Sequence, residues 1–371
     1  MEKTVRSGNN SRLVSLDVMR GLTVAMMILV NNGYGESFSQ LQHVKWNGMT
    51  VCDLVFPFFL FMMGISTYLS LKKTQFQATP AVLRKILKRG ILLFLIGLGI
   101  NWFDHAIEGD LLCFGHLRIW AVMQRIALCY LAVSLFAITV KHKYAFPVII
   151  ALLAIYTVIV LLGNGYAEDA TANILAQVDL RLFGYEHLYH KSPVDPEGLV
   201  STIPAIAHTM IGFLCGQIIC SKKDVNAKML RMVDNGVRLA VLGFALVIWL
   251  PLNKHIWSPT FVLATCGLAM LLLALIIRIE KTNPPRAIKK TGDGARLFFL
   301  VFGMNPLFLY VLSELMAILF GHFGISEWLF NTIHSAVSAP KWASLAYAFT
   351  FVMLNWLVGY VLYRRKIFIK L

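Results

Sequence analysis

The sequence is poor in charged residues and lacks the short motifs of several common enzyme classes. Only 14% of its 371 residues are Asp, Glu, Lys or Arg, whereas 58% are hydrophobic, which excludes an ordinary water-soluble globule. It contains no Walker motif, no GxGxxG fingerprint and no GxSxG elbow. The sequence signatures of P-loop nucleotide binding, dinucleotide binding and α/β-hydrolase catalysis are therefore absent.

Cysteine is also scarce and poorly spaced for cross-linking or metal binding. Six cysteines occur, and none forms a Cys/His pattern with zinc-ligand spacing. Four lie in hydrophobic runs, one lies at the start of a run and one lies in a predicted outer loop: Cys129, Cys215, Cys220 and Cys266, then Cys52, then Cys113. We expect neither a disulfide framework nor a metal site.

Hydrophobic runs, by contrast, recur from one end of the chain to the other. A helix needs about 20 mostly apolar residues to cross the hydrocarbon core of a bilayer. We predict an all-α polytopic membrane protein with about ten transmembrane helices, near residues 15–33, 53–71, 87–104, 119–140, 144–163, 202–220, 237–251, 259–279, 297–320 and 343–363.

The basic residues are unevenly distributed around these runs. With a cytoplasmic N-terminus, most of the 34 Lys and Arg lie in cytoplasmic segments and most of the 19 Asp and Glu lie outside. Ten spans then place the C-terminus in the cytoplasm as well. The net charge of +15 indicates topology and contact with anionic lipid rather than nucleic-acid binding.

Short loops join the runs, apart from the segment 164–201, which we expect on the outer side. No loop is long enough to form a soluble domain, so residues 1–371 read as a single transmembrane domain. The first run is interrupted by Asp17 and Arg20, and no small-residue cleavage site follows it. We therefore expect it to remain as a membrane helix rather than to be removed as a signal peptide.

Ionisable side chains within the runs are candidates for function, because burying them in lipid is costly. Asp17 and Arg20 are three residues apart and share a helix face. They form either a salt bridge at the inner membrane surface or a cationic entrance for a phosphate-bearing ligand.

A second polar group lies in "LRIWAVMQRIALCY". Arg118 and Arg125 are two helical turns apart and point the same way, and Gln124 lies beside the deeper arginine. The arginines either pair with acids of the preceding outer loop or bind an anionic ligand. The acids within reach along the sequence are Asp104, Glu108 and Asp110.

The loop between the first two runs holds one histidine and, at its end, a carboxylate. Imidazole titrates near neutral pH, so His43 suits the task of a general base, although a solvated loop histidine is the simpler alternative. Asp53 either orients that imidazole or caps the next helix, and the two roles are compatible. The same stretch also contains Asn31, Asn32, Trp46 and Asn47.

Two further polar groups come later in the chain. Asn253 and Lys254 lie in the short outer loop "LPLNKHIWS". Asn305 precedes Pro306 inside the ninth run, where proline removes a backbone hydrogen bond and kinks a helix. Asn305 then either faces a polar cavity or serves helix packing alone.

Together these segments resemble the heparan-α-glucosaminide N-acetyltransferase family of membrane acyltransferases, including its bacterial members. The string His-x-x-Trp-Asn-Gly followed by Asp-Leu-Val-Phe-Pro is specific, and the matching pieces run in the family's order over nearly the whole chain. These pieces are "RLVSLDVMRG", "LVNNGYG", "HVKWNGMTVCDLVFPFFLFMMG", "LRIWAVMQRIALCY", "DPEGLVSTIPAI", "LPLNKHIWS" and "GMNPLFLY".

The resemblance implies an acetyltransferase that uses cytoplasmic acetyl-CoA and acetylates the amine of a terminal glucosamine on the far side of the membrane. It implies that His43 is the catalytic histidine and that Asn31, or alternatively Asn32, lies near the thioester. From its position in the loop, we assign Asp53 to the same catalytic group. We assign donor contacts to Arg20, Asn32, Arg118, Gln124, Arg125 and Asn305. We assign acceptor contacts to Trp46, Asn47, Glu197, Asn253 and Lys254, with Trp46 as the aromatic face for the sugar ring.

Two departures from the animal enzymes bear on the substrate. The chain lacks their lumenal N-terminal domain and the span before it, and the stretch from Asn31 to His43 is one residue longer. We expect a small glucosamine-bearing sugar rather than a long sulfated polymer. The sequence does not identify the exact sugar. It leaves open whether the protein is a homodimer or has another oligomeric state. It also does not decide between a ping-pong route through acetyl-histidine and a ternary complex. An amino-sugar permease is the alternative function.

Overall fold

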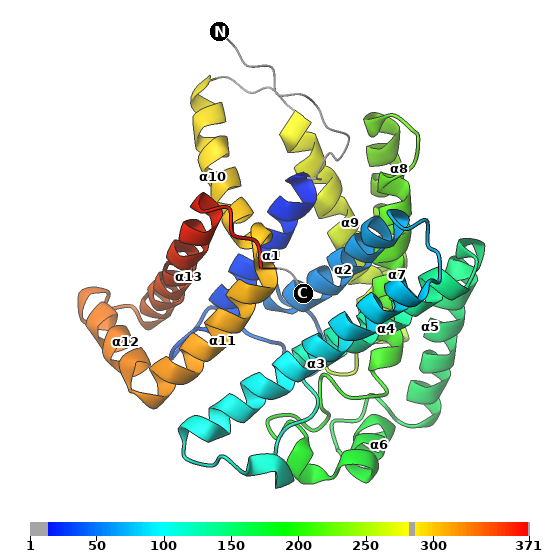
Figure 1. Cartoon of the computed structure of the whole chain (residues 1–371). Helices are drawn as coiled ribbons and strands as arrows, with labels where there is room; N and C mark the ends of the chain where they lie inside the picture. Colours follow the sequence, from blue (N-terminus) through cyan, green and yellow to red (C-terminus); the bar gives the residue numbers. More distant parts are fainter. Residues whose placement is uncertain (1–13, 282–285, 370–371) are drawn as a thin grey trace.

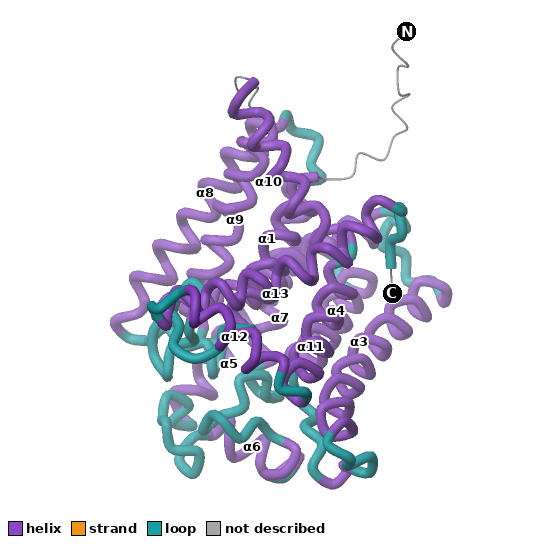
Figure 2. The backbone as a smooth tube through the Cα atoms, turned by 90° about the vertical axis from the view of Figure 1, so that its left-hand side faces the viewer, coloured by secondary structure: helices purple, strands orange, loops and turns teal. Residues whose placement is uncertain are grey.

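The computed structural model describes residues 14–281 and 286–369, and within them the regular elements are helices (Figure 1). The α-helices are α1 (Val14–Asn31), α2 (Val55–Lys72), α3 (Pro80–Ile107), α4 (Val122–Thr139), α5 (Ala145–Leu162), α6 (Ile174–Phe183), α7 (Thr202–Ile219), α8 (Val225–Ala245), α9 (Pro259–Lys281), α10 (Arg286–Met304), α11 (Pro306–His322), α12 (Ile325–Ala336) and α13 (Pro340–Arg364). Figure 2 shows them packed as a bundle, with the longer loops gathered near α6.

The predicted class is confirmed: the chain is an all-helical integral membrane protein with multiple spans. In the described parts of the chain, eight helices are long and apolar enough to cross a membrane, and a bent pair raises the number to as many as nine. The eight candidate spans correspond to α1, α2, α3, α4, α5, α7, α9 and α13. Each corresponds to one of the ten predicted runs.

The ninth predicted run is broken at its centre. The segments Gly292–Met304 and Pro306–His322 meet at an angle of 82°. Asn305 between them has non-helical backbone angles, and Pro306 occupies the first turn of α11, where a missing N–H is tolerated. The kink that Pro306 predicts is therefore confirmed, and it separates α10 from α11.

The seventh predicted run coincides with the end of α8 and the 3₁₀ turn Leu246–Ile248. α8 stays outside the group of eight because it carries four charged residues: Lys228, Arg231, Asp234 and Arg238. The helix nevertheless lies along α9 in both views (Figures 1 and 2). A tenth span at α8 stays a prediction.

Small residues allow the central helices to approach one another closely. A Cβ atom on Gly64 of α2 would lie 2.0 Å from the carbonyl oxygen of Thr209, and one on Gly212 of α7 would lie 2.1 Å from that of Phe61. Without a hydrophobic driving force in lipid, close backbone contact is a main source of helix association. The α2 and α7 pair therefore forms a tight centre of the bundle.

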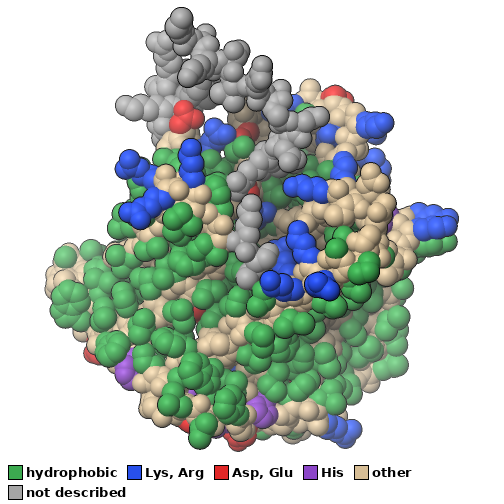
Figure 3. All heavy atoms as spheres, in the orientation of Figure 1, with side chains coloured by type: hydrophobic (Ala, Val, Ile, Leu, Met, Phe, Trp, Pro, Cys, Tyr) green, Lys and Arg blue, Asp and Glu red, His purple; other side chains and the backbone are tan. Residues whose placement is uncertain are grey.

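On the face drawn in Figure 3, apolar and basic side chains gather in different regions. Figure 3 shows apolar side chains around the middle of the molecule and Lys and Arg side chains gathered near the upper ends of the helices. The loops that carry the candidate site lie at the opposite end, with α6 (Figure 1). This separation follows the charge pattern of the sequence, while the cytoplasmic location of the basic end stays a prediction.

Candidate active site

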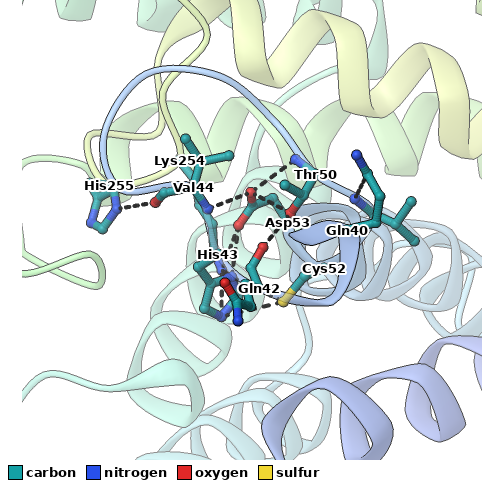
Figure 4. Close-up of polar contacts among 10 residues, drawn as sticks. Gln40, Gln42, His43, Val44, Thr50, Cys52, Asp53, Lys254 and His255 are labelled. Atoms are coloured by element: carbon teal, nitrogen blue, oxygen red, sulfur yellow. Dashed lines mark hydrogen bonds and ion pairs between the residues drawn. The ribbon is translucent and has the colours of Figure 1, made fainter. Parts of the chain in front are cut away.

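His43 and Asp53 form the centre of the candidate site. The Nδ1 atom of His43 lies 2.7 Å from Oδ1 of Asp53 (Figure 4). The histidine side chain is 50% exposed, whereas the carboxylate is 1% exposed. A carboxylate at Nδ1 favours the tautomer that donates Nδ1–H to it, which leaves the lone pair of Nε2 free to accept a proton.

The second oxygen of Asp53 organises the loop around it. Oδ2 accepts hydrogen bonds from the backbone N–H of Val44 at 3.3 Å and from the N–H and hydroxyl of Thr50 at 3.1 and 3.0 Å. No side-chain cap is present at the start of α2. Asp53 therefore fixes the loop that carries His43 rather than capping the following helix.

Two further side chains contact the imidazole of His43. Nζ of Lys254 lies 2.9 Å from Nδ1, 3.3 Å from Nε2 and 3.4 Å from Oδ1 of Asp53. Sγ of Cys52 lies 3.1 Å from Nδ1. The close approach of Cys52 was not anticipated from the sequence, although its position next to Asp53 places it on the same turn.

Lys254 reaches His43 because two loops far apart in the sequence are joined. Asn47 and Asn253 form an isolated antiparallel bridge, and their side-chain amides are hydrogen bonded at 3.2 Å. The N–H of Gly48 also donates to the carbonyl oxygen of Leu252 at 2.7 Å. Asn253 is fully buried. The two asparagines that we assigned to the acceptor thus hold the loops together.

Trp46 also supports the loops instead of offering an open ring face. It is 5% exposed, its indole N–H donates to the carbonyl oxygen of Tyr166 at 2.9 Å, and its ring stacks on His255 at 5.4 Å. His255 in turn contacts the carbonyl oxygen of Val44 through Nε2 at 3.2 Å. Burial lowers the pKa of His255, which favours its neutral form.

A cavity of about 470 Å³ opens beside His43. It lies between the loops and the ends of α1, α2, α4 and α11. Its polar lining includes Asn31, His43, Arg118, Glu197, Lys254 and Tyr310. Asn32 instead donates its amide back to the carbonyl oxygen of Ile28 at 2.8 Å. Of the two candidate asparagines, Asn31 is the one that lines the cavity.

A second cavity of about 510 Å³ adjoins the first and shares Asn31 and His43 with it. Glu314 of α11 lines this second space together with Asn31 and Tyr310. Glu314 was not selected from the sequence. The sequence could have indicated it, because Glu314 is a single carboxylate within an apolar run.

The segment 164–201, which we expect on the outer side, contributes a wall of the cavity through an ion-pair cluster. Nη2 of Arg118 lies 3.1 Å from Oδ1 of Asp195 and 2.9 Å from Oε2 of Glu197, and its guanidinium lies over the ring of Tyr189. Burial opposes the charge of Arg118, but the two carboxylates outweigh it and raise its pKa. The partners of Arg118 thus come from the outer segment rather than from the loop before α4.

Arg125 and Gln124 lie inside the bundle and line neither of the two cavities. Arg125 is fully buried; its Nη2 donates to the carbonyl oxygen of Gly198 at 3.1 Å and to the hydroxyl of Ser201, and its guanidinium lies over the ring of Trp257. Gln124 is also fully buried. In the described residues Arg125 thus links α4 to the outer segment.

The remaining predicted donor contacts lie away from His43. Arg20 pairs with Asp17 at 3.0 Å and donates to the hydroxyl of Ser66 at 2.9 Å. Asn305 is fully buried and is hydrogen bonded to the backbone of Ile367 and Ile369, at 3.0 and 2.8 Å. The side chain of Asn305 therefore holds the C-terminal segment against the break between α10 and α11.

A narrow apolar space of about 10 Å³ adjoins the cavity inside the bundle. It is formed by side chains of α1, α2, α4 and α11: Met27, Phe56, Phe59, Val122, Met123, Ile126, Leu307 and Tyr310. Four of these, Met27, Phe56, Val122 and Tyr310, also line the larger cavity. The space therefore extends the cavity into the bundle, away from the loops.

Comparison with known proteins shows the family of the chain. The family described as heparan-alpha-glucosaminide N-acetyltransferase, catalytic, matches residues 12–253, which is more than half of the chain. The chain belongs to this family. The match contains both His43 and Asp53, as well as Arg118 and Glu197, and it ends one residue before Lys254.

Two members of the heparan-alpha-glucosaminide N-acetyltransferase family illustrate the distance of the relationship. The enzyme of that name from Mus musculus is 26% identical over 436 residues, covering 100% of this chain and 62% of the relative. The one from Homo sapiens is 27% identical over 428 residues, covering 97% of this chain and 60% of the relative. The chain thus spans about three fifths of the length of the curated relatives it matches.

Proposed function

We propose that the protein is a transmembrane acetyltransferase that moves an acetyl group from cytoplasmic acetyl-CoA to the amine of a glucosamine-containing sugar on the outer side. The observation that carries this proposal is the pair of His43 and buried Asp53 beside a cavity, in the segment that matches the family. From the charge pattern we place both termini in the cytoplasm, and we expect the membrane to be a bacterial inner membrane.

In the proposed reaction Nε2 of His43 is the base. It takes a proton from the sugar ammonium, and the resulting amine attacks the thioester carbonyl carbon of acetyl-CoA. The new N–C bond forms as the C–S bond breaks, and the sulfur leaves as CoA thiol with the proton that the amine gives up. Asp53 stabilises the imidazolium while His43 carries a proton. An acetyl-histidine intermediate is the alternative route.

Asn31 is suited to the thioester carbonyl. A primary amide has two N–H groups, so Asn31 can donate one to Glu314, which lines the same space, and the other to the developing negative charge on the carbonyl oxygen. Tyr310, one helical turn before Glu314 on α11, lines this space as well. We therefore assign Asn31 to the reacting atoms and Glu314 to the positioning of Asn31.

The donor side is supported by the apolar space and the basic end of the bundle. The thin pantetheine arm suits a path along α1, α2, α4 and α11, and CoA phosphates need cationic partners. Arg20 lies on α1, one of the helices of that path, and further basic residues occur in the first turns of α3: Arg84, Lys85, Lys88 and Arg89. Because the space is only about 10 Å³, side chains such as Phe59 must move when acetyl-CoA binds.

The acceptor side is supported by the polar lining under the outer segment. Glu197 is a carboxylate that suits a sugar ammonium, and Tyr189 and Lys191 line the same cavity. Since Trp46 is buried, Tyr189 is the aromatic residue that we assign to the acceptor wall. The modest volume of the cavity fits a small amino sugar or the end of a short oligosaccharide.

The decisive experiment uses purified full-length protein with labelled acetyl-CoA and a panel of amino sugars, with mass spectrometry of the products. We expect N-acetylated hexosamine, and we expect His43→Ala to lower the rate by about 10²–10⁴-fold. His116→Ala is the matched control, because His116 pairs with Asp110 in an outer loop and does not line the cavity. Sugar uptake into vesicles without acetyl-CoA consumption would support a permease instead.

A further inference from the structure

Lys254 places a primary amine where the proposed reaction needs its acceptor. Its Nζ atom lies 3.3 Å from Nε2 of His43, the nitrogen assigned as the base, and 3.4 Å from Oδ1 of Asp53 (Figure 4). The side chain is 15% exposed and lines the same cavity as Asn31. A lysine ammonium and a glucosamine ammonium offer the base the same functional group.

The position of this amine is fixed by the backbone that carries it. Gly48 and Leu252 are hydrogen bonded at 2.7 Å, and the carbonyl oxygen of Lys254 accepts a bond from the N–H of Trp257 at 3.0 Å. Asn253, the preceding residue, is fully buried and bonded to Asn47. With both sides of Lys254 held, its amine stays within reach of His43.

We propose that the enzyme acetylates its own Lys254 when no sugar occupies the cavity. This inference rests on the proposed function, because it uses the same donor and the same base. His43 takes one proton from the Lys254 ammonium and passes it to solvent. The neutral amine attacks the thioester, the N–C bond forms, the C–S bond breaks, and the second proton lost by nitrogen ends on the sulfur of CoA.

Two other lysines of the same cavity serve as internal controls. Lys45 and Lys191 both line it, and both are exposed. In residues 14–281 and 286–369, however, neither has a hydrogen bond or ion pair with His43. Chemical acetylation by the thioester would favour such exposed lysines, whereas acetylation that depends on His43 selects Lys254.

Acetylation of Lys254 would inactivate the site. It converts an ammonium into a neutral amide, removes the ion pair with Asp53 and adds an acetyl group beside His43, where the acceptor amine must lie. The modification should therefore be slow when sugar is present, since sugar and Lys254 compete for the same base. Preincubation with acetyl-CoA alone should lower the rate of later sugar acetylation, and added sugar should protect.

The test incubates the purified full-length protein with isotopically labelled acetyl-CoA, without sugar, and maps labelled lysines by peptide mass spectrometry. We expect at least tenfold more label at Lys254 than at Lys45 or Lys191. We expect none at Lys254 in His43→Ala, or in His43→Gln should the alanine variant fail to fold. Lys254→Arg should remove the label and the inactivation by preincubation together.

Parallel measurement of sugar acetylation separates this inference from the proposed function. If the preparation acetylates sugar but Lys254 carries no label, the inference is wrong and the proposed function is retained. A labelled Lys254 without any sugar product supports the inference and overturns the choice of acceptor. Labelling of Lys45 and Lys191 equal to that of Lys254 would show chemical acetylation and would overturn the inference. Labelling of Lys254 that persists in both His43 variants would overturn it in the same way.

Discussion

Replacing Asp53 by asparagine tests the catalytic pair at a single atom. In the native protein, Oδ1 faces Nδ1 of His43, while Oδ2 accepts hydrogen bonds from Val44 and Thr50. An asparagine must keep an oxygen on the side of these donors, because an amide NH₂ group there would face three N–H or O–H groups. Its nitrogen is therefore forced towards His43.

This orientation reverses the hydrogen bond that sets the tautomer. The amide of the substituted side chain would donate to Nδ1 of His43, so the ring proton would move to Nε2 and remove the lone pair that acts as the base. The equivalent change in the serine-protease triad lowers kcat by about 10⁴-fold, which corresponds to about 5 kcal/mol. We expect a loss of similar size for Asp53→Asn, with the fold retained because the oxygen still serves Val44 and Thr50.

The assay is steady-state sugar acetylation, with a melting curve of each purified variant to confirm folding. Asp110→Asn is the matched control, because this exposed carboxylate also pairs with a histidine, at 2.9 Å, but lies in another loop. We expect the control to keep wild-type turnover. A folded Asp53→Asn protein with kcat near that of the wild type would refute both the tautomer argument and the assignment of Nε2 as the base.

Three further outcomes follow from the geometry. Glu197→Gln should raise the acceptor KM by about tenfold to a hundredfold, because it removes a carboxylate from the cavity and weakens the charged contact with Arg118 at 2.9 Å. A change in the KM for acetyl-CoA alone would contradict this prediction. Burial lowers the pKa of His255, so at this residue the native state binds fewer protons than the unfolded state. The native state therefore loses stability as the pH falls below about 6.5. The Tm of His255→Gln should fall less than that of the wild type between about pH 7.5 and 5.5. Gly64→Val should abolish a folded peak in detergent size-exclusion chromatography, because its Cβ would lie 2.0 Å from a carbonyl oxygen of α7. Gly99→Val should fold, because, its own helix backbone apart, no described atom lies within 4 Å of the Cβ position.

Features that depend on local chain geometry could be predicted from the sequence. Hydrophobic runs long enough to cross a bilayer must form helices to satisfy their backbone hydrogen bonds, and Pro306 must interrupt the one that contains it. The pairing of His43 with Asp53 is also local, since only ten residues separate them in one loop. The salt bridge between Asp17 and Arg20 follows in the same way from their spacing on a helix.

Contacts between distant segments could not be predicted, because the sequence contains no record of which loops meet. Lys254 lies 211 residues from His43, and Glu197 lies 79 residues from Arg118. Trp46 was expected to face a sugar, but the joining of its loop to the loop of His255 buries it. The sequence shows which residues of a loop are polar or aromatic. Whether these side chains are exposed depends on which other segments pack against the loop.

The arrangement of the cavity bears on how two substrates can enter a membrane-embedded site without competing. On the loop side, His43 and Lys254 are held by paired backbones, and charged groups such as Glu197 line a space of about 470 Å³. Towards the basic end, the same cavity continues only as an apolar space of about 10 Å³. A polar sugar is favoured on the first path, because hydroxyls need hydrogen-bonding partners that the second path lacks. In the proposed reaction the thin pantetheine arm uses the apolar path, and the two substrates then meet beside Asn31 from opposite directions.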